Sequence, residues 1–105
     1  MAEFSKQGDL STSGTVLYTG TSGAVLTKVM ALRFNNPLAY DLLLEKFEAS
    51  TSTTTVIYDL SLSAGDTITD NLVYALNPGD QLIATSNIAG TTYYVYGLDY
   101  ASNGQ

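Results

Sequence analysis

Two aspartates in a repeated turn pattern are the first residues of this chain that could do chemistry. Asp66 and Asp80 each follow a glycine in the pattern Leu-x-x-Gly-Asp-x-Ile/Leu, which occurs twice. Paired carboxylates could act as the acid and base of a glycosidase, and three together could bind calcium. Further aspartates lie at Asp59, Asp70 and Asp99. The simpler interpretation is that Asp66 and Asp80 accept hydrogen bonds from backbone N–H groups of tight turns, because no Asp-x-Asp-x-Asp loop is present.

Nucleophilic catalysis has no candidate base in this sequence. Serine and threonine are plentiful, but histidine and cysteine are absent, and there is no Gly-x-Ser-x-Gly motif. These absences remove the commonest general base, the commonest transition-metal ligand and every thiolate site. Residues 20–23 contain two glycines but lack the lysine and the following helix of a phosphate-binding loop. The sequence therefore predicts a protein that is not an enzyme and that binds no cofactor or metal.

The tyrosines give the strongest indication of a functional surface. Four of the eight lie between residues 93 and 100, and Tyr94, Tyr96 and Tyr100 share one face of the strand predicted there. Such residues could form sheet core, a protein–protein interface, or a platform on which sugar rings stack. For the interface interpretation, the candidate residues are Phe4, Leu10, Tyr93, Tyr94, Tyr96 and Tyr100.

Composition narrows the class of partner. The net charge is −6, and the four cationic residues are scattered along the 105-residue chain, which excludes nucleic acid as an expected partner. No apolar run approaches the roughly 20 residues of a membrane span, and the opening residues do not resemble a signal peptide, so no membrane partner is expected. Only 13% of the residues are charged, and the hydroxyl-rich surface that follows is common on β proteins that assemble.

Short β-type segments separated by turns must position these groups. The predicted strands cover residues 14–19, 24–34, 39–48, 56–62, 67–76, 81–86 and 91–101. In the second of them one face carries Leu26, Met30, Leu32 and Phe34, interrupted by Lys28, and the strand is expected to be apolar on both faces near its middle. Residues 39–48 contain good helix formers, but the segment is short and lies between strands, which favours a strand.

The two ends of the chain are expected to lie outside the folded domain. Residues 1–14 are polar apart from Phe4 and Leu10, and they are predicted to form an N-terminal arm and not a strand. The β-sandwich domain then spans residues 15–101, and residues 102–105 form a polar tail. Seven or eight strands with regular turns and no alternating helices predict an all-β, antiparallel β-sandwich of jelly-roll type.

Several short motifs occur in a fixed order along the chain. They are Leu-Tyr-Thr at 17–19, a long apolar strand at 29–36, Ala-Gly-Asp at 64–66 and Leu-Asn-Pro-Gly-Asp at 76–80. This order, from Val16 to Tyr100, resembles the small all-β virion proteins of tailed bacteriophages, which are head-decoration (cement) proteins or neck and tail components. The Pro-Gly-Asp turn is also similar to that of cupin barrels, but the metal-binding histidines of that family are missing.

The resemblance implies a structural role in the virion after synthesis in the host bacterial cytoplasm. The expected function is that of a cement protein, a homotrimer or other small symmetric oligomer, which bridges subunits of the major capsid protein. A neck or tail subunit is the alternative within the same class. A carbohydrate- or surface-binding module that uses the Tyr-rich final strand is the alternative from a different class. Deleting residues 1–12 is expected to leave the domain folded and to weaken particle binding.

Overall fold

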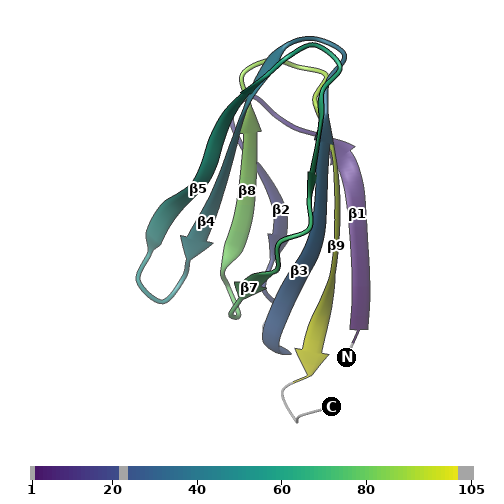
Figure 1. Ribbon diagram of the computed structural model, residues 1–105. Coiled ribbons are helices and arrows are strands. Elements are labelled where there is room, and N and C mark those ends of the chain that lie inside the picture. Colours follow the sequence, from purple (N-terminus) through teal and green to yellow (C-terminus); the bar gives the residue numbers. More distant parts are fainter. Residues whose placement is uncertain (1, 22–23, 102–105) are drawn as a thin grey trace.

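Two antiparallel sheets face each other in the computed structural model, which describes residues 2–21 and 24–101 (Figure 1). Its strands are β1 (Ala2–Asp9), β2 (Thr15–Thr19), β3 (Ala24–Asn35), β4 (Tyr40–Glu48), β5 (Thr53–Leu62), β6 (Thr67–Asp70), β7 (Tyr74–Leu76), β8 (Gln81–Ser86) and β9 (Thr92–Ala101). One sheet has the order β1-β9-β3-β6, with β7 also paired to β3, and the other has the order β2-β8-β4-β5. In the part of the chain that is described, no helix is long and apolar enough to cross a membrane.

The strand pairs are nested, which defines the topology. Strand β1 pairs with β9, β2 with β8, β3 with β6 and β7, and β4 with β5, all antiparallel. Strands β6 and β7 pair with successive parts of β3, so they occupy one strand position that is interrupted at residues 71–73. Nested antiparallel pairs in two sheets are the arrangement of a jelly roll. The predicted jelly-roll sandwich is therefore confirmed, and so is the strand at residues 40–48.

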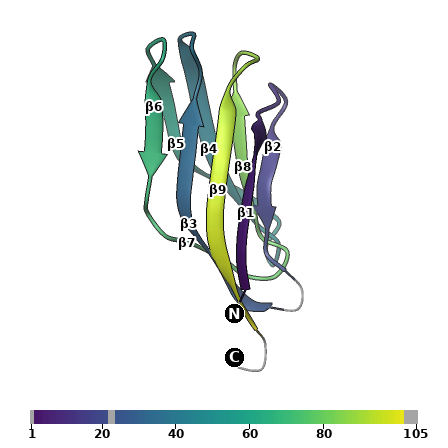
Figure 2. The same ribbon diagram turned by 90° about the vertical axis from the view of Figure 1, so that its right-hand side faces the viewer.

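The N-terminal segment corrects the prediction of an arm. Residues 2–9 form strand β1, which pairs with β9 from Ala2 opposite Asp99 to Asp9 opposite Thr92. Figure 2 shows β1 running beside β9 along the edge of the sheet. An edge strand is held by backbone hydrogen bonds on one side, so its side chains can be almost entirely polar and exposed, as they are here apart from Phe4. The predicted tail at 102–105 and residues 22–23 of the predicted turn lie outside the described residues.

The core lies between the two sheets. The buried apolar side chains are Leu10, Leu17, Val29, Leu32, Phe34, Tyr40, Leu42, Leu44, Leu76, Leu82, Ala84, Tyr93 and Val95. Strand β3 buries residues from both of the alternating sets seen in its sequence, because its register shifts between Val29 and Ala31. Thr27 and Val29 are buried before this bulge, and Leu32 and Phe34 after it. A bulge adds one residue to the strand and so exchanges the two faces.

Candidate interaction surface

The carboxylates of the turn aspartates accept hydrogen bonds from backbone N–H groups, as the simpler interpretation predicts. The carboxylate of Asp66 accepts a hydrogen bond from the backbone N–H of Ser63 at 3.2 Å. The carboxylate of Asp80 accepts from the N–H groups of Asn77 at 3.0 Å and of Ala49 at 2.9 Å. The glycines that precede the two aspartates have φ values of +80° and +89°, a conformation that side chains disfavour. Both patterns are corners that fix strand register.

Asp70 joins the two sheets on one open side of the sandwich. Its Oδ2 accepts hydrogen bonds from the hydroxyl of Tyr58 at 3.0 Å and from that of Tyr74 at 2.6 Å. Tyr58 belongs to β5 and Asp70 to β6, so the first of these bonds crosses from sheet to sheet. Burial, reinforced by the Asp70 carboxylate, raises the pKa of both tyrosines well above the ordinary value of 10.0. Both hydroxyls therefore stay protonated and keep donating.

Asp99 forms the matching bridge on the other open side. Its carboxylate, on β9, accepts a hydrogen bond from the hydroxyl of Tyr18 on β2 at 2.7 Å and another from Thr27. The ring of Phe4 stacks on that of Tyr18 with the centroids 3.6 Å apart and the planes 8° from parallel. The aspartates thus hold the sheets together. Among the residues that the structure describes, no group of three or more His, Cys, Asp or Glu side chains could hold a metal ion.

The six predicted interface residues separate into two groups. Leu10 and Tyr93 are only 4% and 9% exposed and belong to the core, so their prediction as interface residues is wrong. Phe4 is half-buried against Tyr18 and also packs on the core. Side chains alternate along β9, so Tyr93 points inward and Tyr94 points to the outer face. The remaining three, Tyr94, Tyr96 and Tyr100, lie half-buried on the outer face of the β1-β9-β3-β6 sheet.

The half of this outer face that lies near the chain termini is apolar. Across the strands, Tyr96 is opposite Ala31, Leu98 is opposite Lys28, and Tyr100 is opposite Leu26. We call the half-buried residues Leu26, Ala31, Tyr96, Leu98 and Tyr100 the apolar half. The ammonium of Lys28 lies 5.2 Å from the centre of the Tyr100 ring, within the range of a cation–π contact. No element of the described chain covers this face (Figure 2).

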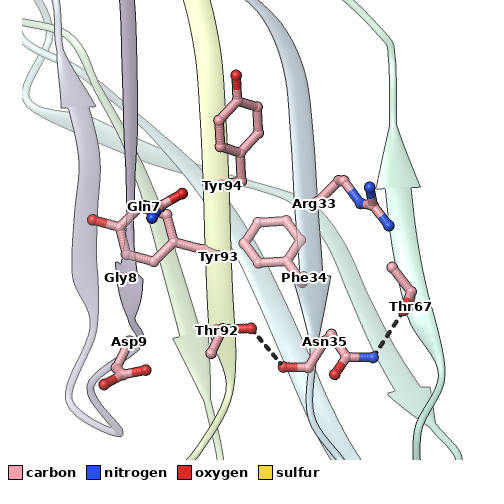
Figure 3. A pocket seen from close by; sticks show the side chains of 10 residues that line it. All are labelled: Gln7, Gly8, Asp9, Arg33, Phe34, Asn35, Thr67, Thr92, Tyr93 and Tyr94. Atoms are coloured by element: carbon pink, nitrogen blue, oxygen red, sulfur yellow. Dashed lines mark hydrogen bonds between the residues drawn. The ribbon is translucent and has the colours of Figure 1, made fainter.

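The other half of the same face is polar and hollowed. Two rows of outward residues cross four strands there. We call these residues the polar half: Gln7, Tyr94, Arg33 and Thr69 in one row, and Asp9, Thr92, Asn35 and Thr67 in the next. A hollow of about 740 Å³ lies over seven of them, all except Thr69, and Figure 3 shows the Tyr94 ring between Gln7 and Arg33. Sequence reasoning found Tyr94 but missed its two neighbours, because only the cross-strand register places them beside it.

A second, smaller hollow lies at the open side of the sandwich, between β5 and the β6–β7 edge. It has a volume of about 480 Å³ and is lined in part by Tyr58, Leu60 and Ile68. Leu72, on its rim, is 69% exposed, and the adjacent Val73 is 54% exposed. The hydroxyl of Tyr58 is already bonded to Asp70, so the hollow offers few free polar groups.

Comparisons with known proteins identify the fold. No family model and no curated protein matches the chain. A subunit of the disulfide-linked pili that form Bacillus endospore appendages superposes with a TM-score of 0.56 at 8% identity, over 95% of this chain and 85% of that chain. Two structures of pentameric capsid proteins from metagenomic phage sequences give TM-scores of 0.56 and 0.54 at 17% and 15% identity. This chain covers 65% of the length of each capsid protein, and each match includes 96% of this chain. The protein thus has a jelly-roll fold like that of capsid and pilus subunits.

Proposed function

We propose that this protein is a non-enzymatic structural subunit that associates with copies of itself through the outer face of the β1-β9-β3-β6 sheet. The observation that carries the proposal is the apolar half, where three aromatic or aliphatic side chains of β9 stand next to one another on an uncovered sheet face. When a second surface removes half-buried aromatic and aliphatic side chains from water, the free energy of the system falls, so association is favoured.

One row of charges on this face favours a second copy as its occupant, against the general repulsion between two copies. The chain carries a net charge of −6, so two copies repel each other over most of their surfaces. In the apolar half, Leu98 has Glu3 beside it on β1 and Lys28 beside it on β3. A two-fold axis parallel to β9 would place β1 of one copy over β3 of the other. Each Glu3 would then approach the Lys28 of the other copy, so the row is complementary to itself.

The finer proposal is a subunit of a tailed-phage virion, most specifically a cement protein on the capsid. It is supported by the order of the turn motifs and by the fold shared with the phage capsid proteins. A cement protein that binds only the assembled shell stabilises that shell by mass action. A neck or tail subunit fits the same observations. The Bacillus pili whose subunit shares this fold are described as disulfide-linked. These 105 residues cannot form such a linkage because they contain no cysteine.

The test compares the oligomeric mass of matched variants by size-exclusion chromatography with light scattering. The wild-type protein is expected to elute with at least twice the monomer mass of 11.2 kDa. Leu98→Glu buries a carboxylate in the centre of the contact and is expected to give monomers. Thr69→Glu adds the same charge to the polar half of the same face and is expected to behave as wild type. A wild-type monomer, or equal masses for all three proteins, would contradict self-association through this face.

The virion assignment has its own experiment. Purified protein is mixed with phage heads that lack it, and the heads are sedimented. Co-sedimentation that saturates at a fixed ratio to the major capsid protein supports the cement role, and binding to isolated necks or tails would support the alternative. A mass of three chains would support the homotrimer implied by the phage resemblance over the two-fold contact described above. Binding to none of these particles would contradict a virion role.

A further inference from the structure

The polar half of the outer face forms a regular grid of side chains. Neighbouring strands lie about 4.8 Å apart and outward residues about 6.8 Å apart along a strand, so the two rows span about 14 Å by 7 Å. Seven of the eight side chains carry hydroxyl, amide or guanidinium groups, and the eighth, Asp9, carries a carboxylate. No aliphatic side chain interrupts it. The grid is therefore chemically distinct from the apolar half that begins at Tyr96.

The floor of the hollow is fixed by internal hydrogen bonds. The side-chain amide of Asn35 donates to Thr67 Oγ1 at 2.8 Å and to the backbone oxygens of Gly65 and Asp66 at 3.1 and 3.3 Å. The hydroxyl of Thr92 donates to the backbone oxygen of Asn35 at 3.4 Å (Figure 3). These bonds hold one corner of the grid in place before any ligand arrives, which lowers the entropic cost of binding.

The rim, in contrast, keeps its hydrogen-bonding groups free. Within residues 2–21 and 24–101, the side chains of Gln7, Asp9, Arg33 and Tyr94 have no hydrogen-bond partner, and the ion pair between Lys46 and Asp80 involves none of them. Arg33 offers up to five donors, Asp9 only acceptors, and Gln7 both. Gln7 and Arg33 flank Tyr94 on the two neighbouring strands, and Asp9 lies in the next row, beside Thr92 (Figure 3).

We propose that this polar half is a binding site for a neutral oligosaccharide. A sugar ring presents an apolar C–H face, which matches the ring of Tyr94, and a rim of hydroxyls that both donate and accept, which matches Gln7, Asp9 and Arg33. An anionic ligand would meet the Asp9 carboxylate and the net charge of −6, and a cationic ligand would meet Arg33. An apolar ligand would find three aromatic residues, Phe34, Tyr93 and Tyr94, among seven lining residues that are polar or glycine, whereas apolar sites are lined mainly by apolar side chains.

The experiment uses the full chain and two stages. A glycan array with neutral and acidic oligosaccharides is probed first, and neutral ones are expected to bind. Soluble maltotriose, cellotriose and chitotriose are then titrated into the wild type and into Leu98→Glu, and binding is followed by amide NMR shifts. Leu98→Glu carries the test, because the two-fold contact proposed above would lay the polar half of a second copy over the hollow. Shifts are expected at residues 7–9, 33–35 and 92–94. Tyr94→Ala and Arg33→Ala are each expected to weaken binding at least about tenfold, the loss that follows removal of one charged hydrogen bond or one stacked ring.

Tyr100→Ala, made like Tyr94→Ala and Arg33→Ala in the Leu98→Glu background, is the matched control, since it removes the same side chain from the same face of the same strand outside the hollow. It is expected to bind oligosaccharides as Leu98→Glu alone does. The proposal is overturned if Leu98→Glu binds no glycan, if acidic glycans bind best, or if adding Tyr94→Ala or Arg33→Ala leaves binding unchanged. Thermal unfolding of each variant shows whether it is folded. Self-association is read as oligomeric mass, and glycan binding is read in the Leu98→Glu background, so failure of this site and failure of self-association are distinguishable.

Discussion

Gly97 is the position at which one added methyl group tests the arrangement of β1, β9 and β3 most severely. A Cβ built on Gly97 would lie 2.2 Å from the backbone oxygen of Lys28 and 2.5 Å from the Phe4 ring. The φ of Gly97 does not lie in the left-handed region, so backbone strain makes no contribution and the cost is one of space alone. Gly97→Ala must therefore displace either a strand backbone or a ring that is stacked on Tyr18.

The expected cost follows from those two contacts. Extra methylene groups in a packed core cost about 1–3 kcal/mol, and the lost stacking of Phe4 on Tyr18 adds about 0.5–1.5 kcal/mol. The reduced entropy of the unfolded chain offsets about 0.4–1 kcal/mol, which leaves a net loss of about 0.5–4 kcal/mol. For a domain of this size, each kcal/mol lowers Tm by about 4–8 °C, so Tm is expected to fall by at least about 2 °C.

Urea unfolding followed by circular dichroism measures this loss, and Gly8→Ala is its matched control. A Cβ on Gly8 would come no closer than 3.4 Å to the ring of Tyr93, which is an ordinary contact. Gly8→Ala should therefore change stability by less than about 1 kcal/mol. Adding Phe4→Ala to Gly97→Ala should relieve only the contact with the ring, because the Lys28 carbonyl remains. Equal stability of Gly97→Ala and wild type would refute the packing of β1 against β9 described here.

Two further predictions concern the tyrosine bridge and the N-terminal strand. Because the pKa of Tyr58 and that of Tyr74 are raised in the folded chain, their contribution to stability is complete below about pH 10 and is lost above it, where the unfolded chain ionises first. Above about pH 10 the free energy of unfolding should fall by at most about 1.4 kcal/mol per pH unit for each tyrosine, and by less than that because both side chains are partly solvent-exposed. Urea midpoints of wild type and Tyr58→Phe measured across this pH range should fall less steeply in the variant. Deleting residues 1–9 removes the whole of β1 and exposes the edge of β9. The truncated chain should therefore unfold at a lower urea concentration than wild type, or aggregate. A truncated chain as stable as wild type would show that β1 is dispensable, as expected of an arm.

Local chemistry made much of the fold predictable. A glycine followed by an aspartate sets a turn by its own φ and its own hydrogen bonds, so the corners at Gly65 and Gly79 needed no tertiary information. Alternation likewise identified the outward tyrosines of β9. Residues 39–48 were predicted to form a strand because the segment is short and lies between strands, and pairing with β5 and β8 explains why its helix-forming side chains do not prevail.

What could not be predicted depends on pairing between distant segments. Strand β1 has no alternating pattern, because pairing with β9 and not side-chain burial makes it a strand. The bulge after Val29 leaves no sequence signature, yet it decides that Leu32 faces the core while Ala31 faces outward. The row that joins Gln7, Tyr94 and Arg33 likewise exists only once the register of three strands is known. For the same reason, the sequence showed tyrosines on one face but not the division of that face into two halves.

A charge exchange between Glu3 and Lys28 tests the proposed self-association most directly. The variants Glu3→Lys, Lys28→Glu and the double variant are compared with wild type by light scattering over a range of protein concentrations. Each single variant places like charges opposite each other across the contact and should dissociate it, and the double variant should restore the wild-type mass. The same mass for all four proteins, or a double variant no better associated than the single ones, would contradict a self-complementary contact through this face.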